Sequence, residues 1–121
     1  MTKIIESISE WTSTNVTRLT IVTDGGEGKV QVDLPNDKEN RFGERTALIW
    51  DLYVHPDYRR RGIAKELMQY ALKRAKEHGF NTATLEWELE DTPRHIAWWY
   101  GSLGFDEKEF SDSYALMVKQ L

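Results

Sequence analysis

The chain has 121 residues, of which 40% are hydrophobic and 12% aromatic, a formal net charge of −4 and no cysteine. This length suits one domain with a single core, and the lack of cysteine excludes disulfides, thiolate metal sites and a cysteine acyl-enzyme. The negative charge argues against general nucleic-acid binding. No apolar run is long enough to cross a bilayer and no signal segment is recognisable, so we expect a cytoplasmic protein without a membrane partner.

Positive and negative charges are separated along the sequence. Residues 55–80 contain seven Lys or Arg and three acids, net +4, whereas residues 81–113 contain two Lys or Arg and eight acids, net −6. Opposite fields of this kind attract an anionic ligand to one segment and a cationic ligand to the other. The chain is therefore electrically polarised along its sequence.

The N-terminal half begins with an ambiguous element. Residues 3–12 carry apolar residues that fit one face of a helix, although a short strand is also compatible with them; we favour the helix. Residues 16–24 and 30–34 then alternate apolar and polar side chains around a glycine-rich turn. This pattern predicts a β-hairpin.

Strands and helices alternate in the rest of the chain. The polar residues 35–45 predict a mobile loop, residues 47–54 a strand, and residues 62–78 an amphipathic helix that Gly79 is placed to end. Further strands are predicted at residues 82–89, 105–110 and 114–121, with a helix at 92–103 that starts at Thr92 and Pro93. This order predicts an α/β fold in which antiparallel strands precede a central parallel pair.

The turn before the first clear helix carries Arg59, Arg60 and Arg61, followed by Gly62. Free N–H groups and the positive dipole end at a helix start can hold a phosphate, and glycine lets it approach closely. Three arginines at this end oppose the dipole unless an anion binds there; a surface Arg cluster without a ligand is the alternative. The spacing matches neither a P-loop nor a dinucleotide fingerprint.

Two motifs carry a family resemblance. Arg59-x-x-Gly62-x-Ala64 resembles the acyl-CoA pyrophosphate loop of the GNAT superfamily of N-acetyltransferases, and Tyr100-Gly-Ser-Leu-Gly-Phe105 resembles a second motif of that family. The resemblance covers roughly residues 45–121. It implies one N-acetyltransferase domain over residues 1–121, with a mixed, mostly antiparallel sheet, a central splayed parallel strand pair and flanking helices.

The resemblance also implies a shortened N-terminal part. The pair of helices that usually builds one wall of the acceptor cleft has no room before the hairpin at residue 16. The cleft would then be open or closed by a second subunit, so we expect a homodimer.

By the same resemblance, the chain binds acetyl-CoA through main-chain groups. The implied cofactor-binding residues are Leu52, Tyr53 and Val54 in the strand and Arg59, Arg60, Arg61, Gly62, Ile63 and Ala64 in the turn. The strand residues would pair with the pantetheine arm, and an amide of the splayed strand would stabilise charge on the thioester oxygen. The side chains of Leu52 and Val54 would also belong to the core.

Tyr100 matches the tyrosine that many family members use as general acid toward the departing thiolate, although a packing role is the alternative. The general base is harder to place, because Trp50 stands where related proteins often carry Glu, and Asp51 is expected on the opposite side of the strand. The strand that flanks the acceptor site in the family carries Glu86 and Glu88, which become the candidate bases; a solvated strand face is the alternative.

Together these features predict transfer of an acetyl group from acetyl-CoA to a primary amine, by direct attack in a ternary complex. The acceptor is expected to be cationic, either a small molecule or a peptide amine. A non-catalytic acyl-CoA-binding module is the alternative, and nucleic-acid binding by the arginines ranks last. The three histidines lack ligand spacing, so no metal is expected.

Overall fold

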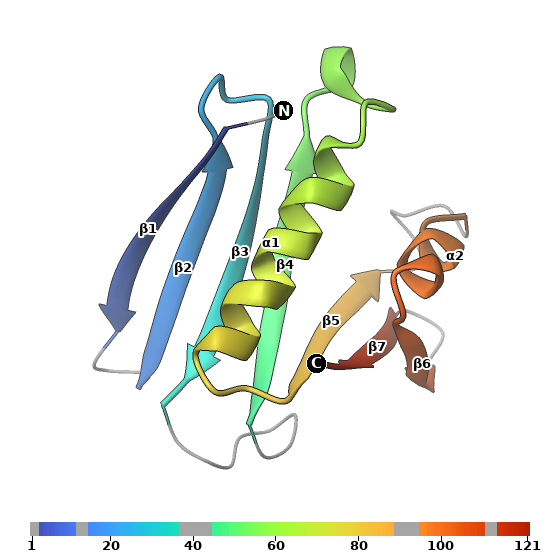
Figure 1. Cartoon of the computed structure of the whole chain (residues 1–121). Coiled ribbons are helices and arrows are strands. Elements are labelled where there is room, and N and C mark those ends of the chain that lie inside the picture. Colours follow the sequence, from blue (N-terminus) through green and yellow to red (C-terminus); the bar gives the residue numbers. More distant parts are fainter. Residues whose placement is uncertain (1–2, 12–14, 37–44, 89–94, 111–113) are drawn as a thin grey trace.

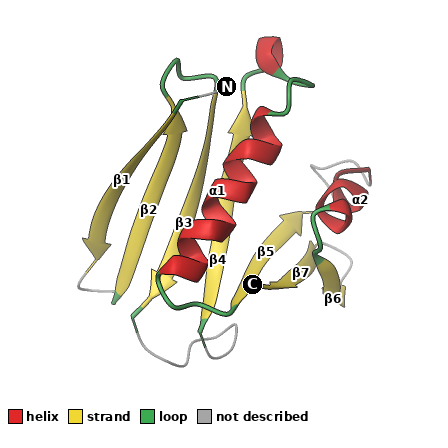
Figure 2. Cartoon of the chain, viewed as in Figure 1, coloured by secondary structure: helices red, strands yellow, loops and turns green. Residues whose placement is uncertain are grey.

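The computed structural model describes residues 3–11, 15–36, 45–88, 95–110 and 114–121. The elements in chain order are β1 (Ile4–Trp11), β2 (Val16–Thr23), β3 (Gly28–Pro35), β4 (Thr46–Val54), the short 3-10 helix η1 (Pro56–Tyr58), α1 (Ile63–Glu77), β5 (Thr82–Glu88), α2 (His95–Ser102), β6 (Asp106–Phe110) and β7 (Tyr114–Gln120). These strands form one sheet in the order β1-β2-β3-β4-β5-β7-β6, with α1 packed across β2, β3 and β4 (Figure 1, Figure 2). The predicted mixed sheet with a central parallel pair and flanking helices is confirmed.

The first element is a strand, so the helix predicted for residues 3–12 is wrong. β1 pairs antiparallel with β2 along its whole length, from Ile4 opposite Thr23 to Trp11 opposite Val16. Isoleucine suits a pleated strand, and the ladder pairs the backbone groups of β1 that face β2, so pairing with β2 outweighs a weak helical pattern. Only residues 12–15 separate the two strands along the chain.

The predicted hairpin β2–β3 is confirmed and supplies much of the core. Alternate side chains of β2 and β3, among them Leu19, Ile21, Val30 and Val32, are buried against the apolar stripe of α1. Gly28 allows this close packing, because a Cβ at that position would lie 3.0 Å from both Leu67 Cδ1 and the Tyr53 carbonyl oxygen. The core therefore fixes α1 against the strand that leads into its own N-terminus.

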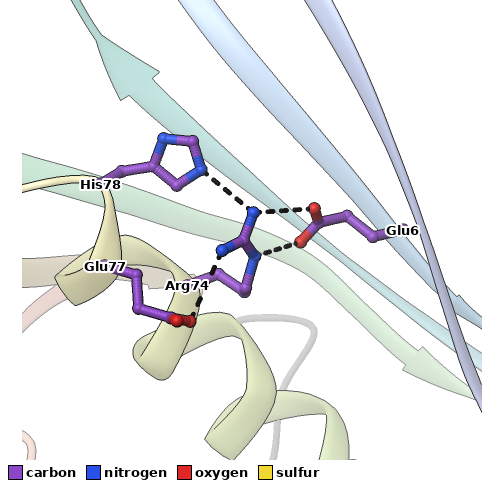
Figure 3. A network of polar contacts seen from close by, with 4 residues as sticks. All are labelled: Glu6, Arg74, Glu77 and His78. Carbon is purple, nitrogen blue, oxygen red and sulfur yellow. Dashed lines mark hydrogen bonds and ion pairs between the residues drawn. The ribbon is translucent and has the colours of Figure 1, made fainter.

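A polar network joins the edge strand β1 to the last turns of α1 (Figure 3). Arg74 Nε donates to Glu6 Oε1 at 2.7 Å, and Arg74 Nη2 donates to Glu6 Oε2 at 3.1 Å. Glu77 and His78 contact the same guanidinium at 3.5 and 3.3 Å. The hydrogen bonds to Glu6 raise the pKa of Arg74, so the guanidinium stays charged, and the two bonds hold β1 against the helix.

Some predicted features lie outside the described residues, namely most of the loop at 35–45 and the helix start at Thr92 and Pro93. Within the described ranges, neither α1 nor α2 has the length and apolar character that a membrane-spanning helix needs.

Candidate active site

The parallel strands β4 and β5 separate after a short common stretch. They pair only at Thr46 with Thr82, Ala47 with Ala83 and Leu48 with Thr84. β4 then continues to Val54 beside β3 alone, and β5 continues to Glu88 beside β7 alone. Figure 1 shows the two strands diverging toward their carboxyl ends. The main chain of β4 beyond Leu48 therefore lacks a strand partner on its β5 side, which confirms the predicted splayed pair.

A β-bulge interrupts β4 within this unpaired stretch. Gln31 lies opposite Trp50 and Lys29 lies opposite Tyr53, so β4 has one residue more than β3 between these two pairs. Asp51 takes up the extra length with a φ of 57°, a left-handed conformation that Asp tolerates better than most residues. The bulge breaks the simple alternation of side chains along β4.

Because of this bulge, Asp51 does not point away from Trp50, and the expectation that it does is wrong. The Asp51 carboxylate contacts Lys29 and Gln31 of β3, and Gln31 is the residue directly opposite Trp50. Arg18 lies over the Trp50 ring at 4.8 Å on the same side. Trp50 and Asp51 thus share the sheet face that α1 does not cover.

Trp50 fills the position at which the resemblance places a base. Its indole Nε1 is buried and makes no hydrogen bond. Such a group is a donor only and cannot accept a proton. The residue at this position therefore contributes packing and no base.

The turn from β4 to α1 is built around its own side chains. His55 Nδ1 accepts from the Asp57 amide at 3.2 Å, and Arg59 Nε donates to the Val54 carbonyl at 2.9 Å. Arg59 also lies 5.9 Å from the Tyr53 ring and Arg61 lies 5.3 Å from the Tyr58 ring. Two of the three arginines therefore brace the turn, and all three remain exposed.

Residues in the left-handed region lead the chain into α1. Arg60 has a φ of 65° and Gly62, the N-cap, a φ of 80°. The Gly62 carbonyl accepts the first helical hydrogen bond from Glu66, so the amides of Ile63, Ala64 and Lys65 have no partner within the helix. Gly62 offers no side-chain cap, and a Cβ placed on it would meet nothing within 4 Å. The helix start thus offers N–H groups without a helical acceptor, together with positive charge, to an anion.

The implied pantetheine-contacting residues occupy the unpaired end of β4. Val54 is buried, Leu52 is half-buried against the core, and Tyr53 is exposed. The side chains of Leu52 and Val54 pack in the core, while the main chain of this stretch has no strand partner on its β5 side.

Tyr100 lies on α2 and is half-buried. Its ring makes edge contacts with Trp99 at 5.1 Å and with Phe105 at 6.1 Å, and its carbonyl accepts the amides of Leu103 and Phe105. Burial raises the pKa of Tyr100, so its hydroxyl keeps its proton at neutral pH. The Tyr100 ring therefore packs against Trp99 and Phe105, and its hydroxyl carries the proton that a general acid would donate.

Glu86 and Glu88 lie on the part of β5 that has separated from β4, with their backbones opposite Leu116 and Tyr114 of β7. Their side chains lie outside the described part of the structure. The part of the chain that is described contains no group of three potential ligands suited to a metal ion.

The sequence interpretation did not include Lys29 and Gln31, whose side chains contact Asp51. The alternation of β3 already assigns both to its polar face, but their contact with Asp51 depends on the bulge in β4.

Known proteins similar in sequence show the family to which the chain belongs. The sequence profile of the acetyltransferase (GNAT) family matches residues 27–105. The chain belongs to this family. An uncharacterised N-acetyltransferase of Methanocaldococcus jannaschii is 35% identical over 75 residues, which are 62% of this chain and 32% of that protein. This GNAT chain spans only about a third of the length of the curated relatives it matches.

Solved structures show the same fold. A PaiA N-acetyltransferase of Thermoplasma acidophilum in complex with coenzyme A matches with a TM-score of 0.68 and 20% identity, over 88% of this chain and 62% of that chain. The ribosomal-protein-S18-alanine N-acetyltransferase of Escherichia coli matches with a TM-score of 0.63 and 16% identity, over 96% and 94% of the two chains. These likenesses support the GNAT fold of the chain.

Proposed function

We propose that this GNAT domain transfers an acetyl group from acetyl-CoA to a primary amine. The observation that carries the proposal is the early separation of β4 from β5 next to an uncapped helix start. The separation leaves a strand edge free for an extended arm, and the helix start supplies N–H donors for a pyrophosphate. One carrier with both groups, acetyl-CoA, suits both features.

In this proposal the carrier is held mainly by main-chain groups. The amides from Arg60 to Ala64 bind the pyrophosphate, because the Arg59 amide already donates to the Pro56 carbonyl at 3.4 Å, and Leu52, Tyr53 and Val54 pair with the pantetheine arm. Side chains of Arg60 and Arg61 add positive charge at the surface. The arrangement is supported by the αL conformations of Arg60 and Gly62, which turn the chain into α1.

The reaction is direct attack in a ternary complex. The neutral amine nitrogen adds to the thioester carbonyl, the carbon–sulfur bond breaks, and the amide product and free thiol leave. Tyr100 gives its proton to the thiolate; burial raises the pKa of Tyr100, so the hydroxyl stays protonated at neutral pH until the thiolate forms. A carboxylate, Glu86 or Glu88, takes the proton that the amine loses, directly or through water.

The acceptor is proposed to be cationic. Residues 81–113 carry a net charge of −6, which attracts an ammonium group, while the net charge of +4 over residues 55–80 attracts the anionic carrier. Equal rates with neutral and cationic amines at low salt would remove this part of the proposal. A homodimer that closes the acceptor side is also proposed, and a monomeric mass in solution would contradict it.

A second candidate function is acyl-CoA binding without transfer. Trp50 favours it, because a buried indole replaces the base that the family resemblance suggests at this position. A pure binding module would be stabilised by coenzyme A but would release no thiol when amines are added.

Thiol detection with acetyl-CoA and a panel of amines tests the proposal. Amine-dependent thiol release, with acetylated amine identified by mass, is the expected result. Thermal stabilisation by coenzyme A without amine-dependent release would support the binding module instead. No response to millimolar coenzyme A in either assay would contradict both functions.

A further inference from the structure

The carboxylate of Asp51 already holds a primary ammonium group, that of Lys29. Lys29 Nζ lies 3.0 Å from Asp51 Oδ2, and Gln31 Nε2 donates to the same oxygen at 3.4 Å. The two charged side chains are 46% and 33% exposed, so the pair is open to solvent and to a ligand. Asp51 can therefore bind an ammonium group, and in this structure the Lys29 side chain supplies that group.

The position of Asp51 places this site beside the reacting centre of the proposed transferase. Asp51 lies past Leu48, the last residue of β4 that pairs with β5. The five residues of strand from Val54 back to Trp50 span four steps, or about 13 Å. An extended arm that starts at the α1 N-terminus and follows β4 therefore ends beside the bulge.

The opposite faces of β4 separate the two substrates. α1 packs on one face of β2, β3 and β4. In the proposed binding mode the carrier follows this side from the helix start. Asp51, Lys29 and Gln31 lie on the other face, which neither α1 nor η1 covers in the described part. An acceptor that approaches from that face meets Asp51 on its way to the thioester.

We propose that Asp51 binds an ammonium group of the acceptor and that Lys29 occupies this position in the free protein. The inference rests on the proposed acetyl transfer. The attacking nitrogen must be neutral, so the ammonium held by Asp51 is a second amino group of the same molecule. The acceptor class is therefore a molecule with two amino groups. Exposed ion pairs are weak, so such a molecule can displace Lys29.

The selectivity between a diamine and a monoamine of equal chain length tests this inference. We compare kcat/KM for 1,4-diaminobutane and for butylamine, in the parent and in the variants D51N and K29M. Asparagine tolerates the left-handed backbone of position 51, so D51N keeps the bulge. D33N is the matched control, because Asp33 lies on the same face but is committed to Arg18 at 2.7 Å.

The two variants are expected to act in opposite directions. D51N should lower the diamine-to-monoamine ratio roughly twofold to fivefold, as expected for the loss of a partly exposed ion pair. K29M should raise the ratio roughly twofold to fivefold, because it removes the competing ammonium. D33N should leave the ratio unchanged, and the KM for acetyl-CoA should be the same in all four proteins.

A ratio that falls in both D51N and K29M would show that the pair only braces β3 against β4, and would overturn the inference. An unchanged ratio in D51N, or an equal fall in D33N, would overturn it as well. If D51N does not fold, K29M decides alone, and an unchanged or lower ratio contradicts the proposal.

The outcome remains separable from the proposed function. If the parent releases no thiol with either amine, acetyl transfer is wrong, and calorimetric titration of 1,4-diaminobutane into the parent, K29M and D51N still tests the site. Tighter binding by K29M and loss of binding in D51N would support the ammonium site. Equal binding by the three proteins would overturn it.

Discussion

Helices α1 and α2 differ in how deeply they are packed. α1 has 15 residues and buries Ile63, Leu67, Met68, Ala71 and Ala75 against the sheet. α2 has eight residues, and its described apolar side chains, Trp99 and Tyr100, are only half-buried. The polar clamp between Arg74 and Glu6 adds a further tie on the α1 side.

This contrast separates the part of the fold that provides stability, α1 with its sheet, from the part that forms the gap between β4 and β5. β1 to β4 form a continuous antiparallel ladder under α1, whereas only three residue pairs join β4 to β5. Segments with less burial open at a lower free-energy cost than a packed core. We therefore expect the α1 part to dominate the stability of the chain, and the boundary at β5 and α2 to dominate turnover.

The largest expected effect is on stability, from Leu67→Ala. Leu67 is fully buried between α1 and the sheet, so its truncation should lower the free energy of unfolding by about 2–5 kcal/mol. Leu103→Ala, at a half-buried residue that follows α2, should cost less than half of that. Urea unfolding of both variants measures the difference. Equal losses would show that the two parts contribute alike.

Tyr100→Phe should act on turnover and leave folding nearly unchanged. If Tyr100 is the acid, kcat should fall roughly 100-fold, whereas Tyr70→Phe on α1 should keep parental turnover. A kcat of Tyr100→Phe within a few-fold of the parent would rule out the acid role.

The pH dependence of Tyr100 has a defined sign. Burial raises its pKa, so the folded protein binds this proton more tightly than the unfolded chain does. The resulting stability is present below the unfolded pKa and is lost as pH rises through the raised folded pKa. Tyr100→Phe should abolish this alkaline loss, which thermal melts across alkaline pH can measure.

Gly62→Ala should weaken the carrier site through the backbone. Position 62 has a φ of 80°, so alanine would cost about 1–2 kcal/mol, which corresponds to roughly a fivefold to thirtyfold weaker binding of coenzyme A if the αL turn is needed for binding. Gly101→Ala on α2 is the matched control, because its Cβ also meets no atom within 4 Å and its φ is not positive. Equal coenzyme A affinities in calorimetry would show that the αL turn is not required.

The sequence predicted the features that depend on neighbouring residues. The stripe of α1, the turn into its N-terminus and the β2–β3 hairpin each follow from local periodicity and glycine placement, and the structure confirms them. The separation of β4 from β5 came from the family resemblance, since no local pattern encodes where a parallel pairing stops.

Features that depend on distant partners were missed. β1 is a strand because β2 offers it a complete ladder, which residues 3–12 alone do not reveal. The direction of Asp51 follows from one extra residue in β4 relative to β3, and a bulge shifts alternation without leaving a signature in a single strand. The identity of the base was left open for the same reason.

The smallest expected effect concerns the tie between β1 and α1. Glu6→Gln removes the charge from a bidentate pair whose side chains are 25% and 14% exposed, so it should cost about 1 kcal/mol. Glu77→Gln is the matched control on the same guanidinium, at 3.5 Å and 48% exposed, and should cost less than about 0.5 kcal/mol. Hydrogen exchange should then show faster opening of β1 amides in Glu6→Gln, with β3 and β4 unchanged. If β3 and β4 lost protection equally, the edge strand would be part of the cooperative α1 core, and the clamp would hold the whole N-terminal sheet and not its edge alone.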